Sequence, residues 1–155
     1  MASPPETSLI RQSPYTAEQM YALVADVAAY KEFLPYCTGS RVRSVTQGPD
    51  GQKTMQADLM IAYKVLRETY TSEVMLDDAH KTIRVTQAHG PFRKLLNEWR
   101  FTDKPSGGSE VHFYLDFEFQ VPLLRQVIQP IMGRAVEKFI GAFEDRAHDL
   151  YGNQS

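Results

Sequence analysis

The sequence predicts an α+β fold in which a curved antiparallel sheet of about seven strands surrounds one long C-terminal helix. From residue 110 to residue 119, polar and apolar side chains alternate without a break, as in a strand with one buried face. From residue 122 to about residue 151, apolar side chains recur at three- and four-residue steps, which predicts an amphipathic helix of about thirty residues. Because a single long helix follows a series of strands, the sheet must curve around it and enclose apolar space.

The N-terminal part of the chain predicts one strand followed by two short helices. Residues 8–13 form the strand, which Pro14 ends. Thr16 and Gln19 have the spacing of a capping box, which marks the start of the first helix. A second short helix over residues 28–33 ends before Pro35, since the residue that precedes a proline disfavours the helical conformation.

Six further strands are predicted, and the connections between them contain turn residues. The connections are Gly48-Pro49-Asp50-Gly51, Asp77-Asp78, Gly90-Pro91 and Pro105-Ser106-Gly107-Gly108. Turns of this composition join neighbouring antiparallel strands. The predicted strands cover residues 38–46, 53–62, 65–76, 82–89, 95–103 and 109–121.

Length and composition predict one domain over residues 1–155, with an ordered core over about residues 8–151. The 155 residues are 43% hydrophobic and 23% charged, which is enough to bury a large core. The net charge of −2 gives no general attraction to DNA. A single cysteine and four histidines exclude an internal disulfide and favour no metal site. Because residues 1–7 lack the features of a secretion signal or presequence, we expect a cytoplasmic, bacterial protein.

Four motifs resemble those of a known superfamily. They are Val27-x-x-Tyr30-x-x-Phe33-Leu34-Pro35-Tyr36-Cys37 with Ser40, Glu68-x-Tyr70-x-Ser72-x-Val74, Gly90-Pro91-Phe92-x-x-Leu95-x-Asn97-x-Trp99-x-Phe101, and Ala142-Phe143-Glu144-x-Arg146-Ala147. Together they resemble the START-like helix-grip superfamily, and within it the coenzyme-Q-binding proteins of the polyketide cyclase/dehydrase group. The resemblance covers about residues 8–151. It implies a non-catalytic carrier or chaperone for ubiquinone or a similar polyisoprenoid lipid, with a role in cellular respiration.

Polar residues share a parity with apolar ones on two of the predicted strands. Asn97 falls in phase with Trp99, and Glu68 and Ser72 fall in phase with Tyr70. Buried without partners, each polar group would cost about 1–3 kcal/mol. They therefore form a structural network, or bind a ligand headgroup, or lie on the outer face if the parity is reversed. Quinone carbonyls only accept hydrogen bonds, so Asn97, Ser72 and Tyr70 suit them as donors, whereas Glu68 would orient Tyr70 or pair with an arginine.

Three connections are unusually apolar: residues 33–36, 61–66 and 90–95. Gathered at one rim, they would form a mouth, or they would simply seal the end of the sheet. As a mouth, with cationic Lys64, Arg67, Arg93 and Lys94 beside it, this rim would make transient contact with the inner face of the cytoplasmic membrane. Pro130 predicts a kink in the last helix, which would act as a hinge or follow the curvature of the sheet.

The sequence therefore predicts an apolar tunnel between the sheet and the last helix, with ubiquinone as the bound ligand and no catalytic residue, metal site or catalytic cofactor. The predicted ligand-binding residues are Leu34, Pro35, Tyr70, Ser72, Phe92, Asn97, Trp99, Phe101, Phe113, Leu115, Phe117, Ile128, Ile131, Met132 and Val136.

Two alternative functions stay open. Similar START-like proteins are ribosome-association toxins, so the ribosome is a second candidate partner, for which Arg41, Arg43 and Lys53, or the cations of the last helix, would supply a basic surface. The superfamily also contains aromatases and cyclases. One observation distinguishes the carrier from the toxin: whether the purified protein carries quinone or sediments with ribosomes.

Overall fold

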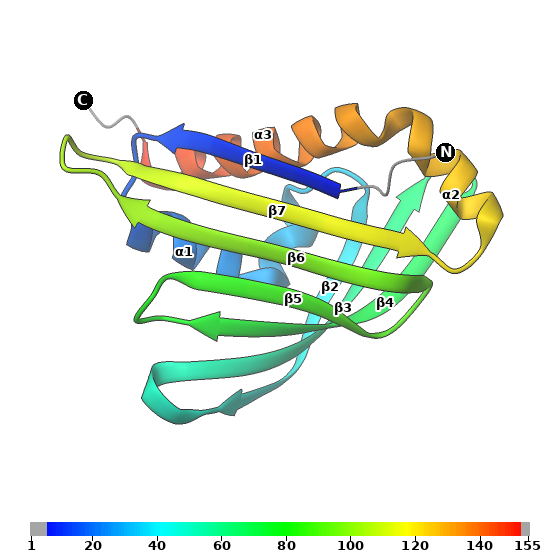
Figure 1. The fold of residues 1–155 in the computed structure, drawn as a ribbon, viewed down its shortest axis with the longest axis horizontal. Helices are drawn as coiled ribbons and strands as arrows, with labels where there is room; N and C mark the ends of the chain where they lie inside the picture. The colour runs from blue at the N-terminus through cyan, green and yellow to red at the C-terminus, as the bar shows by residue number, and fades with distance from the viewer. Residues whose placement is uncertain (1–5, 153–155) are drawn as a thin grey trace.

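The computed structural model describes residues 6–152, in which seven strands form one antiparallel sheet in the order β1-β7-β6-β5-β4-β3-β2 (Figure 1). Consecutive strands from β2 to β7 are neighbours, and the first strand returns to the edge beside β7. The predicted curved antiparallel sheet is confirmed. The strands are β1 (Glu6–Ser13), β2 (Cys37–Gln47), β3 (Gln52–Tyr63), β4 (Leu66–Asp77), β5 (Thr82–His89), β6 (Phe92–Asp103) and β7 (Ser109–Phe119). Most of the N-terminal segment for which the sequence predicts no secretion signal lies outside the described residues.

The short helices follow β1 as predicted. The capping box that begins α1 (Ala17–Ala25) is present, because Thr16 Oγ1 accepts from Gln19 N at 3.1 Å and Gln19 Oε1 accepts from Thr16 N at 2.9 Å. The next helix, η1 (Val27–Glu32), is a 3-10 helix. Ser40 holds it on β2, since Ser40 Oγ donates to the Ala28 carbonyl at 2.8 Å and accepts from Lys31 N at 3.1 Å.

The C-terminal helix is not continuous, which corrects the prediction of one helix of about thirty residues. It consists of α2 (Pro122–Ile128), a 3-10 turn η3 (Gln129–Ile131) and α3 (Met132–Tyr151). Pro130 lies inside η3 and has no N–H to donate, so the α-helical hydrogen bonds break at this point. A short 3-10 helix, η2 (Pro49–Gly51), lies in the β2–β3 connection. None of the described helices is long and apolar enough to cross a membrane.

The alternating pattern of β7 places its apolar side chains on the concave face of the sheet, where they meet α1 and α3. Val111, Phe113 and Phe143 of α3 are each at most 5% exposed and belong to one core cluster. The Trp99 ring lies 4.9 Å from that of Phe113 and 5.2 Å from that of Phe143. This aromatic core fills the space between the sheet and the middle of α3.

Candidate functional site

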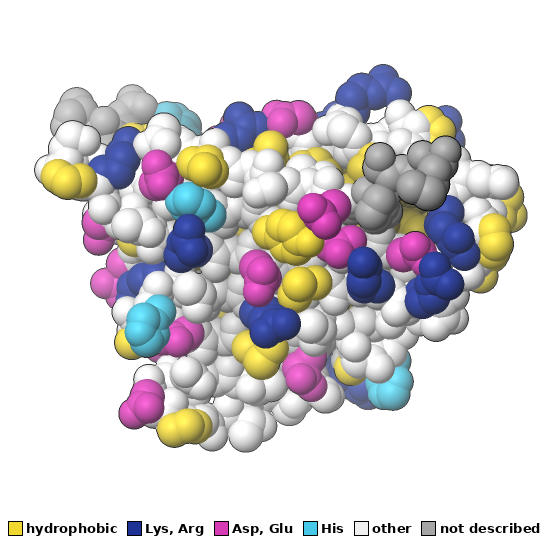
Figure 2. All heavy atoms as spheres, viewed as in Figure 1, with side chains coloured by type: hydrophobic (Ala, Val, Ile, Leu, Met, Phe, Trp, Pro, Cys, Tyr) yellow, Lys and Arg dark blue, Asp and Glu magenta, His cyan; other side chains and the backbone are white. Residues whose placement is uncertain are grey.

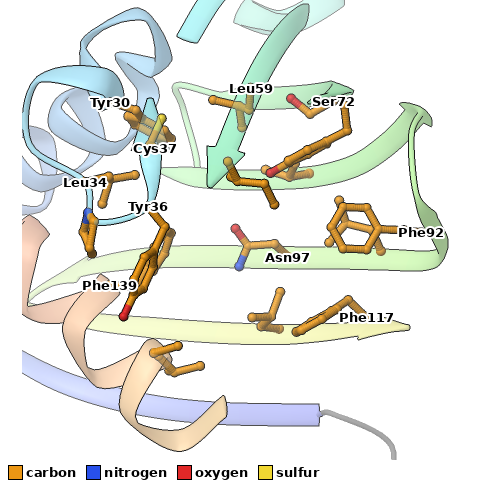
Figure 3. A pocket seen from close by; sticks show the side chains of 18 of the residues that line it. Tyr30, Leu34, Tyr36, Cys37, Leu59, Ser72, Phe92, Asn97, Phe117 and Phe139 are labelled. Atoms are coloured by element: carbon orange, nitrogen blue, oxygen red, sulfur yellow. The ribbon is translucent and has the colours of Figure 1, made fainter. Parts of the chain in front are cut away.

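A pocket of about 260 Å³ lies between the concave face of the sheet, the end of η1 and the helices that run from α2 to α3 (Figure 3). Figure 3 shows Phe92 and Phe117 at one end, Tyr30 and Cys37 at the other, and Asn97 between them. The volume is close to the lower limit of the roughly 300–1,000 Å³ that is typical of small-molecule sites. Within the described residues, no Asp, Glu, Lys, Arg or His lines the pocket.

Asn97 and Ser72 line the pocket, but other groups of the protein already bind them. Asn97 Nδ2 donates to the Tyr114 carbonyl at 2.9 Å, and its Oδ1 accepts from Trp99 Nε1 at 2.9 Å. Ser72 is fully buried, and its Oγ donates to the Ala57 carbonyl at 3.2 Å. The predicted parity of both strands is therefore right, and both polar groups form structural hydrogen bonds.

Tyr70 differs from these two residues. Its side chain lines the pocket, and its hydroxyl has no hydrogen-bond partner within residues 6–152. Burial raises the pKa of this hydroxyl, so it stays protonated and can donate. The ring is fixed by Phe92, with 5.1 Å between ring centroids, and by Gly90, where a Cβ would lie only 2.4 Å from Tyr70 Cβ. The glycine of the Gly90-Pro91-Phe92 motif thus makes room for Tyr70.

The turn that follows Gly90 is held by a side chain of β5. Gln87 donates from Nε2 to the Phe92 carbonyl at 2.8 Å and accepts from Phe92 N at 2.9 Å. Phe92 then stacks on Phe119 with 4.9 Å between ring centroids and is only 7% exposed. Leu34, on the opposite side of the pocket, is 8% exposed. These two residues of the apolar connections are buried parts of the wall and not an exposed rim.

Tyr36 lies in an unusual backbone conformation at the pocket. Its φ of 68° lies in the left-handed region, which bulky residues rarely adopt. Two contacts hold this conformation. Ala62 N donates to the Tyr36 carbonyl at 2.8 Å, and the Tyr63 ring packs against the Tyr36 ring with 5.4 Å between ring centroids. The Lys138 ammonium group of α3 lies 5.9 Å from the centre of the Tyr36 ring. Tyr36 therefore links the η1–β2 connection, the β3–β4 hairpin and α3.

Cys37 and Tyr30 complete the end of the pocket beside η1. Cys37 Sγ donates to the Gly39 carbonyl at 3.4 Å, and burial raises the pKa of this thiol. The Tyr30 hydroxyl donates to the Val24 carbonyl, and burial raises its pKa as well. Sequence reasoning did not select Tyr30, Tyr36 or Cys37 as site residues, although all three fall in the first of the four motifs.

The predicted site residues line this pocket with two exceptions. Trp99 and Phe101 lie outside the lining, because their rings stack with 5.9 Å between centroids and pack into the core, Trp99 against Phe143 of α3 and Phe101 against Tyr21 of α1. Their position along β6 would have distinguished them from the lining residues. Both lie closer than Asn97 to the end of β6 that contacts α1. For the residues that do line the pocket, a role in ligand binding stays a prediction.

The acidic and basic side chains of the described residues lie outside the pocket lining. Asp58 accepts from Thr71 Oγ1 at 2.7 Å and from Arg41 at 3.0 Å, and the Thr71 bond chiefly lowers the pKa of the Asp58 carboxyl. For Glu68 the described residues contain neither the expected hydrogen bond to Tyr70 nor an arginine partner. No group of residues that could bind a metal occurs in the described part of the chain.

A seven-stranded antiparallel sheet curved around a C-terminal helix, with an apolar pocket between them, defines a START-like helix-grip protein. The sequence matches the model of the polyketide cyclase/dehydrase and lipid transport family over residues 13–144. The chain belongs to this family.

Similar proteins differ in the roles that their names give. The ribosome association toxin RatA of Escherichia coli strain K12 is 34% identical over 147 residues, covering 95% of this chain and 89% of the relative. The mitochondrial coenzyme Q-binding protein COQ10 of Dictyostelium discoideum is 26% identical over 149 residues, covering 95% of this chain and 71% of the relative.

Solved structures show the same fold. An 18 kDa protein from Caulobacter crescentus has a TM-score of 0.78 at 32% identity, covering 96% of this chain and 99% of that one. The ZhuI aromatase/cyclase from Streptomyces has a TM-score of 0.77 at 16% identity, covering 92% of this chain and 93% of that one. At the latter identity the likeness extends to the fold alone.

Proposed function

We propose that this protein is a non-catalytic carrier of a neutral polyisoprenoid quinone, ubiquinone, and that it supports respiratory electron transport. The observation that carries the proposal is the contrast between an uncharged apolar pocket and the hydroxyl of Tyr70, which burial keeps protonated and which has no protein partner among the described residues. A ligand group that accepts a hydrogen bond from this hydroxyl would gain roughly 0.5–1.5 kcal/mol of binding free energy.

The lining restricts the chemical class of the ligand. Because no described charged side chain lines the pocket, a carboxylate or phosphate group would lose its hydration without gaining a counter-charge. Fatty acids and phospholipid headgroups are therefore poor candidates. A quinone is neutral, and each of its carbonyl groups accepts a hydrogen bond. The Tyr70 hydroxyl would donate to one carbonyl, while the apolar side chains would contact the ring.

The size of the pocket bears on how much of the ligand would be enclosed. A volume of about 260 Å³ accommodates a headgroup and the beginning of a tail, and not a tail of many isoprenoid units. The remainder would leave between the β3–β4 hairpin and α2, where Leu66 and Ile128 line opposite sides of the pocket. Burial of the first tail units would contribute about 25 cal/mol per Å² of apolar surface before ordering costs.

Two further considerations support a carrier over an enzyme. General acid–base catalysis uses groups that titrate near neutral pH, and the described lining contains no histidine or carboxylate while the pKa of Tyr70 is raised. The relatives are named as a quinone-binding protein and as toxins. The similarity to an aromatase/cyclase concerns the fold, and a cyclase activity would require a catalytic group other than those described.

The test is direct binding of ubiquinone with a short isoprenoid tail to Tyr70→Phe in detergent solution. Loss of one net hydrogen bond of about 0.5–1.5 kcal/mol predicts roughly twofold to twelvefold weaker binding, with an unchanged midpoint of unfolding. Tyr114→Phe is the matched control, since its hydroxyl lies 3.5 Å from Asp116 on the other face of β7. Equal affinity in Tyr70→Phe and the parent would contradict the assigned donor.

Ribosome association is the second candidate, and the 34% identity to RatA favours it. Of the basic side chains that the sequence offers for it, those on the sheet are paired with acids: Arg41 and Arg43 lie 3.0 Å and 3.5 Å from Asp58, and Lys53 lies 3.5 Å from Asp78. Arg134 and Lys138 of α3 pair with no carboxylate in residues 6–152 and stay available for such a contact. Co-sedimentation of the purified protein with ribosomal subunits would test this candidate. Sedimentation that persists in Arg41→Gln would show that any such contact uses another surface.

A further inference from the structure

Three exposed apolar side chains lie on the β3–β4 turn and on α2, two segments that also contribute residues to the pocket wall. Val65 is 99% exposed, Leu123 is 64% exposed and Val127 is 39% exposed, and together they are named here the mouth patch. Val65 is in the β3–β4 turn, between Tyr63 and Leu66, which both line the pocket. Leu123 and Val127 are on α2.

The α2 helix is only partly buried. Leu124 and Ile128 pack against the cluster of Phe92, Phe117 and Phe119, and Ile128 also lines the pocket, but no residue of the helix is fully buried. Single exposed apolar residues are ordinary on protein surfaces, and Ile10 and Val45 are such residues at other places on the sheet. The mouth patch differs from them because its members lie on segments that also line the pocket.

Several cations on or next to the segments that carry the mouth patch have no acidic partner among the described residues. In residues 6–152, no carboxylate lies within ion-pair distance of Lys64, Arg67 or Arg134. Arg125 of α2 donates to the carbonyls of Phe119 and Gln120, so its charge is also not neutralised by an acid. Figure 2 shows Lys and Arg side chains beside exposed hydrophobic ones at the end of the molecule where α2 lies.

Acidic side chains at this end only partly offset that charge. Arg93 pairs with Glu118, and Lys94 lies 2.9 Å from Asp116, so these cations add little. Glu68 is the acidic residue nearest in sequence to Lys64 and Arg67. Since the whole chain has a net charge of −2, the positive charge around the mouth patch is local.

We propose that the mouth patch docks on an anionic lipid bilayer. Val65, Leu123 and Val127 would enter the boundary between headgroups and acyl chains, and Lys64, Arg67 and Arg134 would lie beside lipid phosphates. The combination of exposed apolar side chains and unpaired cations matches the two components of that surface. In a twofold dimer through this patch the same cations would face one another, which disfavours a second copy as the occupant.

This proposal rests on the proposed function in one respect: a quinone would pass between bilayer and pocket without crossing water. The docking itself needs no ligand and can be measured on empty protein. The two proposals can therefore fail separately.

The experiment is flotation of the purified protein with phosphatidylcholine vesicles and with vesicles that also contain phosphatidylglycerol. We expect binding to the anionic vesicles, weakened by salt, and little binding to the neutral ones. Val65→Glu and Leu123→Glu should each reduce partitioning at least about tenfold, because each removes an inserted apolar side chain and adds a repelled charge. Ile10→Glu and Val45→Glu are matched controls that add the same charge to exposed apolar sites elsewhere and should change partitioning little.

The variants at the mouth patch should keep the parent's unfolding midpoint and its affinity for quinone in detergent, since neither side chain lines the pocket. Absence of parent binding to anionic vesicles would overturn the proposal. An equal loss in all four variants would also overturn it, because general repulsion would then explain the result. A dimer in sedimentation equilibrium that Val65→Glu dissociates would assign the patch to a second copy instead.

Discussion

Trp99 Nε1 donates to Asn97 Oδ1 at 2.9 Å, so the most polar side chain in the pocket wall is fixed by a residue of the core. Asn97 Nδ2 also donates to the Tyr114 carbonyl on β7. The Asn97 amide therefore joins two strands and the aromatic core, and its first role is to satisfy buried groups.

We expect Asn97→Ala to lower the free energy of unfolding by about 1–3 kcal/mol, because it leaves the Trp99 N–H without a partner and removes the bond to the Tyr114 carbonyl. Urea titration followed by circular dichroism would measure this. The double variant Asn97→Ala with Trp99→Phe should lower the free energy of unfolding by less than the sum of the decreases in the two single variants. Unchanged stability of Asn97→Ala together with lost quinone binding would instead assign the amide to the ligand.

Cys37 provides a chemical probe of the pocket. Since burial raises its pKa, the thiol holds less of the reactive thiolate at neutral pH than a free cysteine, whose pKa is about 8.5. Alkylation by iodoacetamide should therefore be slow at pH 7 and still increase with pH above 8.5. Short-tailed ubiquinone should slow alkylation further by filling the space beside Cys37. Quinone that binds without protecting Cys37 would place the ligand outside the pocket.

The left-handed backbone of Tyr36 predicts a difference between two substitutions. Tyr36→Ala and Tyr36→Gly both remove the ring and its contact with Tyr63, but only glycine adopts a φ of 68° without strain. The glycine variant should be more stable than the alanine variant by roughly 0.5–1 kcal/mol in thermal unfolding. If the alanine variant were the more stable, the left-handed conformation would not be the one that the protein adopts in solution.

Met132 is at the start of α3, half-buried, and lines the pocket. Met132→Trp should weaken quinone binding at least about tenfold, because the larger side chain would occupy ligand space. The free energy of unfolding of empty protein should change by less than the roughly 1–3 kcal/mol that overpacking a full core costs. Leu150→Trp, at a 52% exposed position of the same helix, is the control for adding tryptophan. Tight quinone binding by Met132→Trp would show that the ligand does not lie beneath this turn.

Most of the architecture could be predicted from local patterns. The alternation in β7 and the capping box at Thr16 identify their elements without reference to distant residues. The break at Pro130 was predicted as a kink, but the lengths of α2 and α3 depend on packing. In the pocket, parity placed Asn97 and Ser72 correctly on the inner face.

The same parity could not separate the pocket wall from the core. Trp99 shares its face with Asn97, yet it lies under α3, and only the crossing position of the helix decides this. Of the exposed mouth residues, Val65 falls in the predicted rim segment 61–66, whereas Leu123 and Val127 of α2 were not predicted. Leu34, Phe92 and Val65 all belong to apolar connections, and the sequence does not distinguish them. In the structure Leu34 and Phe92 are buried, whereas Val65 is exposed.

The central claim is that the pocket holds a neutral quinone, and extraction of the purified protein tests it most directly. The parent protein and Met132→Trp would be expressed in a quinone-producing bacterium, purified without detergent, extracted with organic solvent and examined by mass spectrometry. We expect a ubiquinone in near-stoichiometric amount from the parent and at least about tenfold less from the variant, since the tryptophan occupies the pocket. A parent extract with no quinone, or one dominated by a fatty acid or phospholipid, would contradict the account.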